Sequence, residues 1–271
     1  MIKMLVVDID GTIMGDNRRI SDSLKAYVKL LLSNGIKVVI ATGRMYCSAA
    51  KIACELGTDS PIIAYQGGLV VDSDKNILQA KYFDNELARD VVDYLRREKF
   101  HMNVYVNDNL MAEKESKYII DYATGKAIDY EIVKTLDDVS FDGLNKILAI
   151  DYDTDRIECL VSKMCDRYKD DLYVVKSTPY FCEISNPEAT KGNGIRFLAS
   201  RWGIKQDEIM AVGDQDNDIE MLLASGVRVA MGNATENLKK VSNFITKTVD
   251  EDGVVHAIEK FINLKDLKNG I

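Results

Sequence analysis

Residues 4–12 read MLVVDIDGT, an apolar run that ends in two aspartates and a glycine. A short apolar run without polar alternation is typical of a strand buried on both faces, as in a parallel sheet. Similar runs occur at residues 37–41 (KVVIA), 62–64 (IIA) and 209–212 (IMAV), with helical patterns between them. This alternation of strands and helices predicts an α/β fold with a doubly wound, mostly parallel Rossmann-like sheet.

The pattern changes after about residue 81. An amphipathic helix is expected over residues 86–98, and it is followed by paired short strands, hairpins and two further helices. These features are typical of an α+β module, and the α/β pattern returns only near residue 191. We therefore expect an α/β core formed by residues 1–82 and 188–271, and an inserted α+β domain over residues 83–187.

Four polar clusters share one property: each follows a predicted buried strand or begins a predicted helix. They are Asp8 with Asp10, Thr42 with Gly43, Lys191, and residues 214–218. In open α/β sheets the ligand crevice lies outside the carboxyl ends of the strands. The sequence thus predicts that these four distant segments converge on one site.

The acidic clusters suggest a cation. Asp8 and Asp10 are two residues apart, so extended backbone directs both side chains to the same side. Two carboxylates this close repel each other unless a cation or donor compensates, and Mg²⁺ prefers such oxygen ligands. Alone, the motif is equally well an ordinary Asp-Gly turn. Asp214 and Asp218 are expected to complete the cation site, whereas Asp216 is expected to be the N-cap of the next helix.

The other two clusters suggest an anion. Amide groups at a helix start, together with a hydroxyl such as that of Thr42, bind phosphate. Lys191 beside Gly192 at a helix start is unfavourable for the helix dipole unless an anion lies there. Alone, these residues are an ordinary cap and a surface lysine. Together with the acids they predict phosphoryl transfer, in which a carboxylate attacks phosphorus and a second carboxyl group moves protons.

The composition excludes several other classes. The 271 residues carry a formal net charge of -8, so a general nucleic-acid binder, which needs a basic surface, is not expected. Five cysteines without a CxxC pair and two separated histidines fit neither a disulfide framework nor a zinc site. No signal peptide or membrane span is recognisable, so a cytoplasmic protein without membrane partners is expected. The oligomeric state is left open.

The four clusters in this order, with a large insert between the second and third, resemble the haloacid dehalogenase-like phosphatase superfamily, and within it the Cof-type sugar-phosphatase group. The resemblance covers the whole chain. Its motifs are Asp8-Ile9-Asp10-Gly11-Thr12, Ala41-Thr42-Gly43-Arg44, Lys191-Gly192 and Gly213-Asp214-Gln215-Asp216-Asn217-Asp218.

The resemblance implies a role for each of these residues. Asp8 is the nucleophile and Asp10 the general acid/base, and Asp10 also binds Mg²⁺ through its backbone carbonyl. Asp214 is the other protein ligand of the metal, and Asp218 is an indirect or alternative ligand. The implied phosphate-binding residues are Thr42, Gly43, Lys191 and Asn217, and Arg44 is an implied substrate contact.

The expected function is therefore Mg²⁺-dependent hydrolysis of a small phosphorylated metabolite through an aspartyl-phosphate intermediate. A phosphomutase on the same scaffold and a non-enzymatic phospho-aspartate switch remain alternatives. The chain has Gln66-Gly67 where the family usually has Asn-Gly, which leaves the substrate-side contacts open. Candidate substrates are hexose phosphates, phosphoglycolate, flavin mononucleotide and pyridoxal phosphate, and the cap residues considered are Tyr105, Asn107, Tyr122 and Tyr180.

Overall fold

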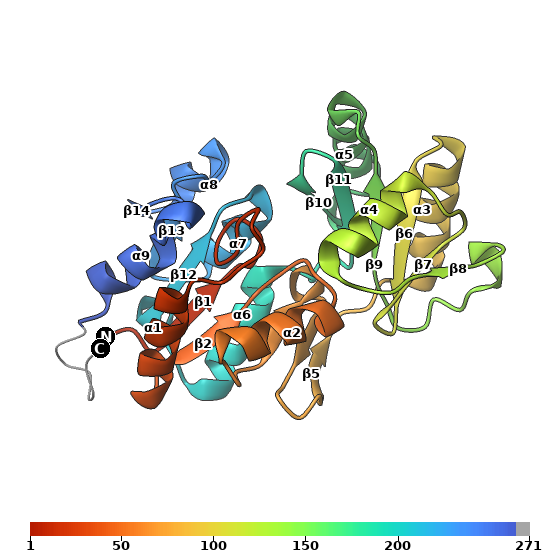
Figure 1. The fold of residues 1–271 in the computed structure, drawn as a ribbon. Coiled ribbons are helices and arrows are strands. Elements are labelled where there is room, and N and C mark those ends of the chain that lie inside the picture. The colour runs from red at the N-terminus through yellow and green to blue at the C-terminus, as the bar shows by residue number, and fades with distance from the viewer. Residues whose placement is uncertain (264–271) are drawn as a thin grey trace.

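The structure, a computed structural model, describes residues 1–263 and contains a parallel sheet of five strands (Figure 1). The strand order is β14-β13-β12-β1-β2, and every neighbouring pair is parallel. In that order the strands span Phe244–Ile245, Val227–Ala230, Ile209–Gly213, Met4–Val7 and Lys37–Ile40. The predicted α/β fold with a mostly parallel sheet is confirmed.

The central strand β1 determines where the carboxyl edge of this sheet lies. All four of its residues are buried, as expected for a strand covered on both faces. Val7 is in register with Val212 of β12 and with Ile40 of β2. The three strands therefore end level with one another, and the residues that follow them meet at one edge.

Helices cover the two faces of the parallel sheet. They are α1 (Asp22–Ser33), α2 (Tyr46–Leu56), α6 (Lys191–Trp202), α7 (Ile219–Leu223), α8 (Glu236–Val241) and α9 (Gly253–Phe261). Ser21 is the N-cap of α1, because its hydroxyl accepts a hydrogen bond from the Leu24 amide. Gly35, just past the end of this helix, has a positive φ of 77° that favours glycine.

The run at residues 62–64 differs in part from its expected role. It forms β3 (Ile62–Ala64), which is joined to the parallel sheet by an isolated bridge between Ala41 and Ile63. Its longer pairing is antiparallel, with β4 (Leu69–Val71), which pairs with β5 (Ile77–Ala80). The turn between β3 and β4 requires glycine at position 67, because φ is +108° there and a Cβ would lie 2.1 Å from the Thr190 carbonyl oxygen.

A second sheet of six strands lies beside the parallel sheet (Figure 1). Its order is β10-β11-β9-β6-β7-β8, and these strands span Tyr173–Thr178, Phe181–Ser185, Leu144–Ile150, His101–Val106, Asn109–Ala112 and Glu131–Ile132. Its helices are α3 (Asn85–Arg97), α4 (Lys117–Lys126) and α5 (Thr154–Tyr168). We call these strands and helices the six-stranded unit.

Two apolar clusters hold the molecule together. One belongs to the six-stranded unit, where α3 and α5 pack on the sheet through residues such as Val91 and Leu160. The other fills the parallel sheet and continues across the junction, because Ile119 and Tyr122 of α4 belong to the same cluster as Ile9. The face of the six-stranded unit that carries α4 thus packs against the carboxyl edge of the parallel sheet.

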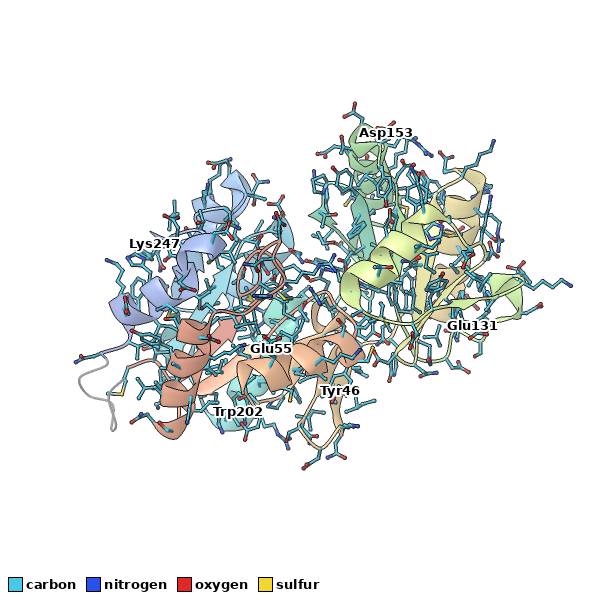
Figure 2. All side chains as sticks on the ribbon, viewed as in Figure 1. Tyr46, Glu55, Glu131, Asp153, Trp202 and Lys247 are labelled. Atoms are coloured by element: carbon cyan, nitrogen blue, oxygen red, sulfur yellow. The ribbon has the colours of Figure 1, made fainter. Side chains whose placement is uncertain are left out.

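Charged side chains project from the outer surfaces of both halves. Figure 2 shows the exposed Glu131 and Asp153 on the six-stranded unit, and Glu55 and Lys247 on the side of the parallel sheet. Within residues 1–263, no helix combines the length and apolar character that crossing a membrane requires.

Candidate active site

The four predicted clusters meet at the carboxyl edge of the parallel sheet. Asp8 directly follows β1, and its amide donates to the Val212 carbonyl at 3.2 Å. Asp214 follows β12, and Thr42 lies two residues past the end of β2. Lys191 is the first residue of α6, a helix capped by the Thr190 hydroxyl. The sheet register therefore brings together residues that are up to 206 positions apart, as 214 − 8 shows.

Three carboxylates form the centre of the site. One oxygen from each of Asp8, Asp214 and Asp218 lies within 4.8 Å of the others, and all three residues are buried. The Asp214 carboxylate accepts hydrogen bonds from the Thr12 hydroxyl at 2.9 Å and from the side-chain Nε2 of Gln215 at 3.0 Å. These donors fix the orientation of Asp214 toward the other two acids.

Lys191 lies between two of these acids. Its Nζ atom is 2.6 Å from Asp8 Oδ1 and 2.6 Å from Asp218 Oδ1, and the side chain is completely buried. Burial alone would lower the pKa of Lys191, but the carboxylates of Asp218 and Asp8 outweigh it and raise this pKa. Lys191 is therefore a fixed positive charge beside Asp8.

When fully ionised, the cluster would carry excess negative charge. Three carboxylates face one ammonium group, and burial raises the pKa of Asp8 to about 7, although Lys191 partly offsets this effect. Burial and the charges of Asp218 and Asp8 raise the pKa of Asp214 as well. A buried group of acids with this imbalance fits a divalent cation, which supplies the missing positive charge.

Asp218 is bonded at both of its oxygens. Oδ1 accepts from Lys191, and Oδ2 accepts from the backbone amides of Asp214 at 2.9 Å and Gln215 at 3.1 Å. These contacts hold the loop after β12 in place. Asp218 thus accepts three hydrogen bonds, whereas Asp214 accepts two, one at each oxygen, so Asp218 is the less suited of the two to contact a cation directly.

The Asp10 carboxylate lies apart from this cluster. Arg44 Nε donates to it at 2.8 Å, and Lys126 of α4 contacts it at 2.9 Å. Burial alone would raise the pKa of Asp10, but the hydrogen bonds and charges of Arg44 and Lys126 lower it well below its usual range. Asp10 is therefore ionised, and Lys126 links it to the six-stranded unit.

Three of the four predicted phosphate-binding residues, Thr42, Gly43 and Asn217, line a cavity that Asp8 also lines. Lys191 does not line it, because it is completely buried behind Asp8 and Asp218. A Cβ on Gly43 would lie 2.4 Å from Gln66 Nε2, so only glycine allows this approach. Asn217 donates to Gln66 Oε1 at 3.1 Å, while its own Oδ1 is buried without a partner among the described residues. That unpaired oxygen is an acceptor and cannot bond a phosphate oxygen, whereas the second N–H of Asn217 Nδ2 can donate to one.

The six-stranded unit contributes residues to this cavity that the sequence analysis did not identify. Lys146 and Glu183 line it from β9 and β11, and Lys146 Nζ binds Glu183 at 2.8 Å and the Gly43 carbonyl at 2.7 Å. Both are buried charges within otherwise apolar strands, NKILAI and FCEIS. Such an isolated charge is the signal that could have identified them, because burying a charge requires a partner.

Two local predictions at the site are wrong. Asp216 is not an N-cap, because Gln215 caps the short 3₁₀ turn Asp216–Asp218, and Asp218 is the cap residue of α7. The Asp216 carboxylate instead accepts from Thr235 and Asn237. The helix predicted to begin at Thr42-Gly43 is α2, which begins only at Tyr46; the Thr42 hydroxyl accepts from the Arg44 amide at 3.2 Å.

Of the four candidate contacts from the inserted segment, two line cavities at the junction. Tyr122 and Tyr180 do so, whereas Tyr105 is completely buried in the apolar cluster. Asn107 donates to the Asp142 carbonyl in a turn of the six-stranded unit. All five cysteines are free thiols, and three of them, Cys54, Cys159 and Cys165, are exposed.

Comparisons with known proteins identify the family of the chain. The family model described as haloacid dehalogenase-like hydrolase matches residues 5–258. A protein from Streptococcus pyogenes serotype M6, whose name assigns it only provisionally as a phosphatase, is 30% identical over 275 residues, covering 96% of this chain and 98% of its own.

Two further comparisons agree. The 5-amino-6-(5-phospho-D-ribitylamino)uracil phosphatase of Bacillus subtilis strain 168 is 27% identical, with 97% of this chain and 99% of its own covered. The crystal structure of a Thermotoga maritima protein superimposes with a TM-score of 0.82 at 33% identity, covering 96% and 98% of the two chains. The chain belongs to the haloacid dehalogenase-like hydrolases, and the expectation of a phosphatase of this family is confirmed.

Proposed function

We propose that this hydrolase removes phosphate from a small phosphorylated metabolite through a phosphate ester formed on Asp8, with Mg²⁺ as cofactor. The observation that carries this proposal is the position of Asp8. It shares the buried Lys191 with Asp218, and it lies within 4.8 Å of both Asp214 and Asp218. The names of curated relatives, which include phosphatases for phosphoglycolate and for a phosphorylated ribitylamino-uracil, support a small soluble substrate.

Mg²⁺ would be held by the carboxylates of Asp8 and Asp214 and by the backbone carbonyl of Asp10. Asp218 would act through its bonds to Lys191 and to the loop amides. When bound, the cation would neutralise charge on the transferred phosphoryl group and on Asp8. The excess negative charge described above supports this assignment.

In the first step, an oxygen of Asp8 attacks phosphorus while the bond from phosphorus to the substrate oxygen breaks. Asp10 gives a proton to that leaving oxygen. Lys191 holds Asp8 in position and stabilises charge on the phosphoryl oxygens, together with the Thr42 hydroxyl, the Gly43 backbone and Asn217.

In the second step, Asp10 accepts a proton from water, which attacks phosphorus and releases Asp8 and inorganic phosphate. The ionised form of Asp10 seen here is the form that accepts this proton. To act first as an acid, Asp10 must gain a proton when substrate is bound. A phosphate dianion that competes for Arg44 and Lys126 would weaken their hold on Asp10 and raise its pKa.

Residues 83–187 would serve as a cap over this site. Lys126, Lys146 and Glu183 reach the cavity from the six-stranded unit, which supports a role in enclosing the substrate. Enclosure of this kind excludes water that would otherwise compete with the leaving group and strengthens the electrostatic contacts inside. Residues 1–82 and 188–271 would then form the hydrolase core.

A phosphate-release assay with a panel of phosphomonoesters tests the proposal. We expect release that requires Mg²⁺ and is abolished in Asp8→Asn, a substitution that preserves side-chain size and should leave the protein folded. Catalysis by Asp8→Asn at the wild-type rate, or release without Mg²⁺ in the presence of EDTA, would contradict it.

A further inference from the structure

A second cavity adjoins the catalytic cavity. It has a volume of about 320 Å³ and lies between the parallel sheet and the six-stranded unit. The two cavities share five lining residues, namely Asp10, Arg44, Tyr122, Lys126 and Phe181. We call this second cavity the aromatic groove, because aromatic side chains form much of its wall.

The aromatic side chains come from α4 and from the ends of β9 and β11. The rings of Tyr118 and Tyr152 are 4.8 Å apart between centroids, and those of Tyr152 and Tyr180 are 5.8 Å apart. Tyr122 and Phe181 form a further pair at 5.6 Å. Tyr152 and Tyr180 remain 39% and 42% exposed. A cluster of exposed aromatic rings next to a catalytic cavity is a typical ligand-binding surface.

We propose that the aromatic groove binds the leaving group of the substrate and that this group carries a planar heteroaromatic ring. The inference rests on the proposed function. In that mechanism Asp10 protonates the leaving oxygen, so the leaving group must lie beside Asp10. Asp10 lines both cavities. The leaving group therefore extends from Asp8 past Asp10 into the aromatic groove.

The hydrogen-bonding groups of the groove favour a ring over a sugar. Aromatic side chains can also pack against sugars, but a sugar needs many polar partners for its hydroxyl groups. Two of the three carboxylates in the lining are already engaged, because Asp121 accepts from the Tyr152 hydroxyl and Asp10 binds Arg44 and Lys126; Asp16 is the third. The tyrosine rings of the lining can pack against a planar ring, and the guanidinium group of Arg18 can donate hydrogen bonds to ring nitrogens or carbonyl oxygens of a heteroaromatic group.

The size of the groove agrees with this substrate class. A cavity of about 150 Å³ is sufficient to bind benzene. The aromatic groove is therefore large enough for a ring system of one or two rings, such as a pyridine or a pyrimidine with its substituents.

A matched pair of synthetic substrates tests the inference. The pair is 2-phenylethyl phosphate and 2-cyclohexylethyl phosphate, which have similar size and apolar character but differ in ring planarity. Acetyl phosphate, which has no ring, reports the phosphoryl-transfer step, and pyridoxal phosphate and glucose 6-phosphate represent natural ring and sugar chemistry. For each compound, kcat/KM is measured with Mg²⁺ and expressed relative to acetyl phosphate.

We expect this relative kcat/KM to be roughly 2- to 12-fold higher for the phenyl compound than for the cyclohexyl compound, the range expected for one aromatic contact. Tyr152→Leu and Tyr180→Leu should each remove about that advantage. Tyr82→Leu is the matched control, because Tyr82 is also 39% exposed but does not line the groove. This control should retain the preference.

The outcomes separate the inference from the proposed function. If acetyl phosphate is hydrolysed but the phenyl and cyclohexyl compounds react equally, or if glucose 6-phosphate exceeds pyridoxal phosphate, the inference is wrong and the proposed function stands. A preference that Tyr82→Leu loses as much as Tyr152→Leu also contradicts the inference. If no compound releases phosphate, both are wrong.

Discussion

Replacing Lys191 by methionine should destabilise the metal-free protein strongly. Lys191 is completely buried and lies 2.6 Å from both Asp8 and Asp218, with Asp214 close by. Methionine has nearly the same length and fills the space, so the substitution removes charge rather than volume. It leaves three buried carboxylates without a counter-charge, apart from hydrogen bonds to the surrounding donors.

The magnitude follows from that loss. Removing one partner of a buried ion pair typically costs about 3–5 kcal/mol. For a protein of this size each kcal/mol lowers Tm by about 2–4 °C, so we expect a decrease of roughly 6–20 °C in EDTA. Turnover should fall by about 10²- to 10³-fold, the usual effect of removing one donor that stabilises the transition-state charge.

Thermal unfolding followed by circular dichroism, with EDTA or with saturating Mg²⁺, measures this effect. A divalent cation that binds among the three acids stabilises the folded state, and it should bind more tightly when the lysine is absent. The Mg²⁺-induced increase in Tm should therefore be larger for Lys191→Met than for the wild type.

Lys146→Met is the matched control, because Lys146 is the other buried lysine of the cavity and pairs with Glu183 instead. Lys146→Met should lose a similar amount of stability in EDTA, but its Mg²⁺-induced increase in Tm should be no larger than that of the wild type. The reasoning is refuted if Lys191→Met unfolds within about 2 °C of the wild type in EDTA, or if Mg²⁺ stabilises both variants equally.

Three other predictions follow from the same geometry. In EDTA the wild type should have a higher Tm at pH 5.5 than at pH 7.5. The pKa of Asp8 is about 7 in the folded protein and about 3.8 in an unfolded chain, so the contribution of Asp8 to stability decreases as the pH rises through that interval. Saturating Mg²⁺ should remove or reverse the difference in Tm. Gly11→Ala should lower Tm and weaken Mg²⁺ binding, measured by calorimetry, because the added Cβ would lie 2.2 Å from Asp214 Oδ2. Gly35→Ala is the control: it has a similar φ but no described atom within 4 Å of its Cβ, so it should lose only the roughly 1–2 kcal/mol of stability that a left-handed residue costs. Equal Mg²⁺ affinity in both variants would contradict this prediction. Lys126→Met should raise the pKa of Asp10, because it removes one of the two cationic side chains that hold this carboxylate ionised. The acidic limb of the kcat/KM profile should therefore move to higher pH. An unchanged pH profile would exclude this role of Lys126.

The parallel sheet and the meeting of the four clusters could be predicted because both depend on local signals. β1 and β12 are short apolar runs that end in acids, and parallel strands in register place such ends at one edge. The bridge of Lys191 between Asp8 and Asp218 is a consequence of that register, although its distances could not be predicted.

The contacts from the six-stranded unit could not be predicted in the same way. Lys126 lies 116 residues beyond Asp10 (126 − 10), and no local pattern relates them; only the packing of α4 against the parallel sheet brings them together. Lys146 and Glu183 did carry a signal, as buried charges in apolar strands, but the pattern of each strand does not identify its partner. Asp216 was misassigned because a 3₁₀ turn capped by Gln215 precedes α7.

The most direct test of the account is to trap the phosphate on the protein. The enzyme is mixed with substrate and Mg²⁺, quenched in acid during turnover and treated with borohydride, which converts an aspartyl phosphate to homoserine. Peptide mass spectrometry then locates the modified residue. The account predicts homoserine at position 8 alone, dependent on substrate. Homoserine at Asp10, Asp214 or Asp218, or continued phosphate release with no modified aspartate, would contradict it.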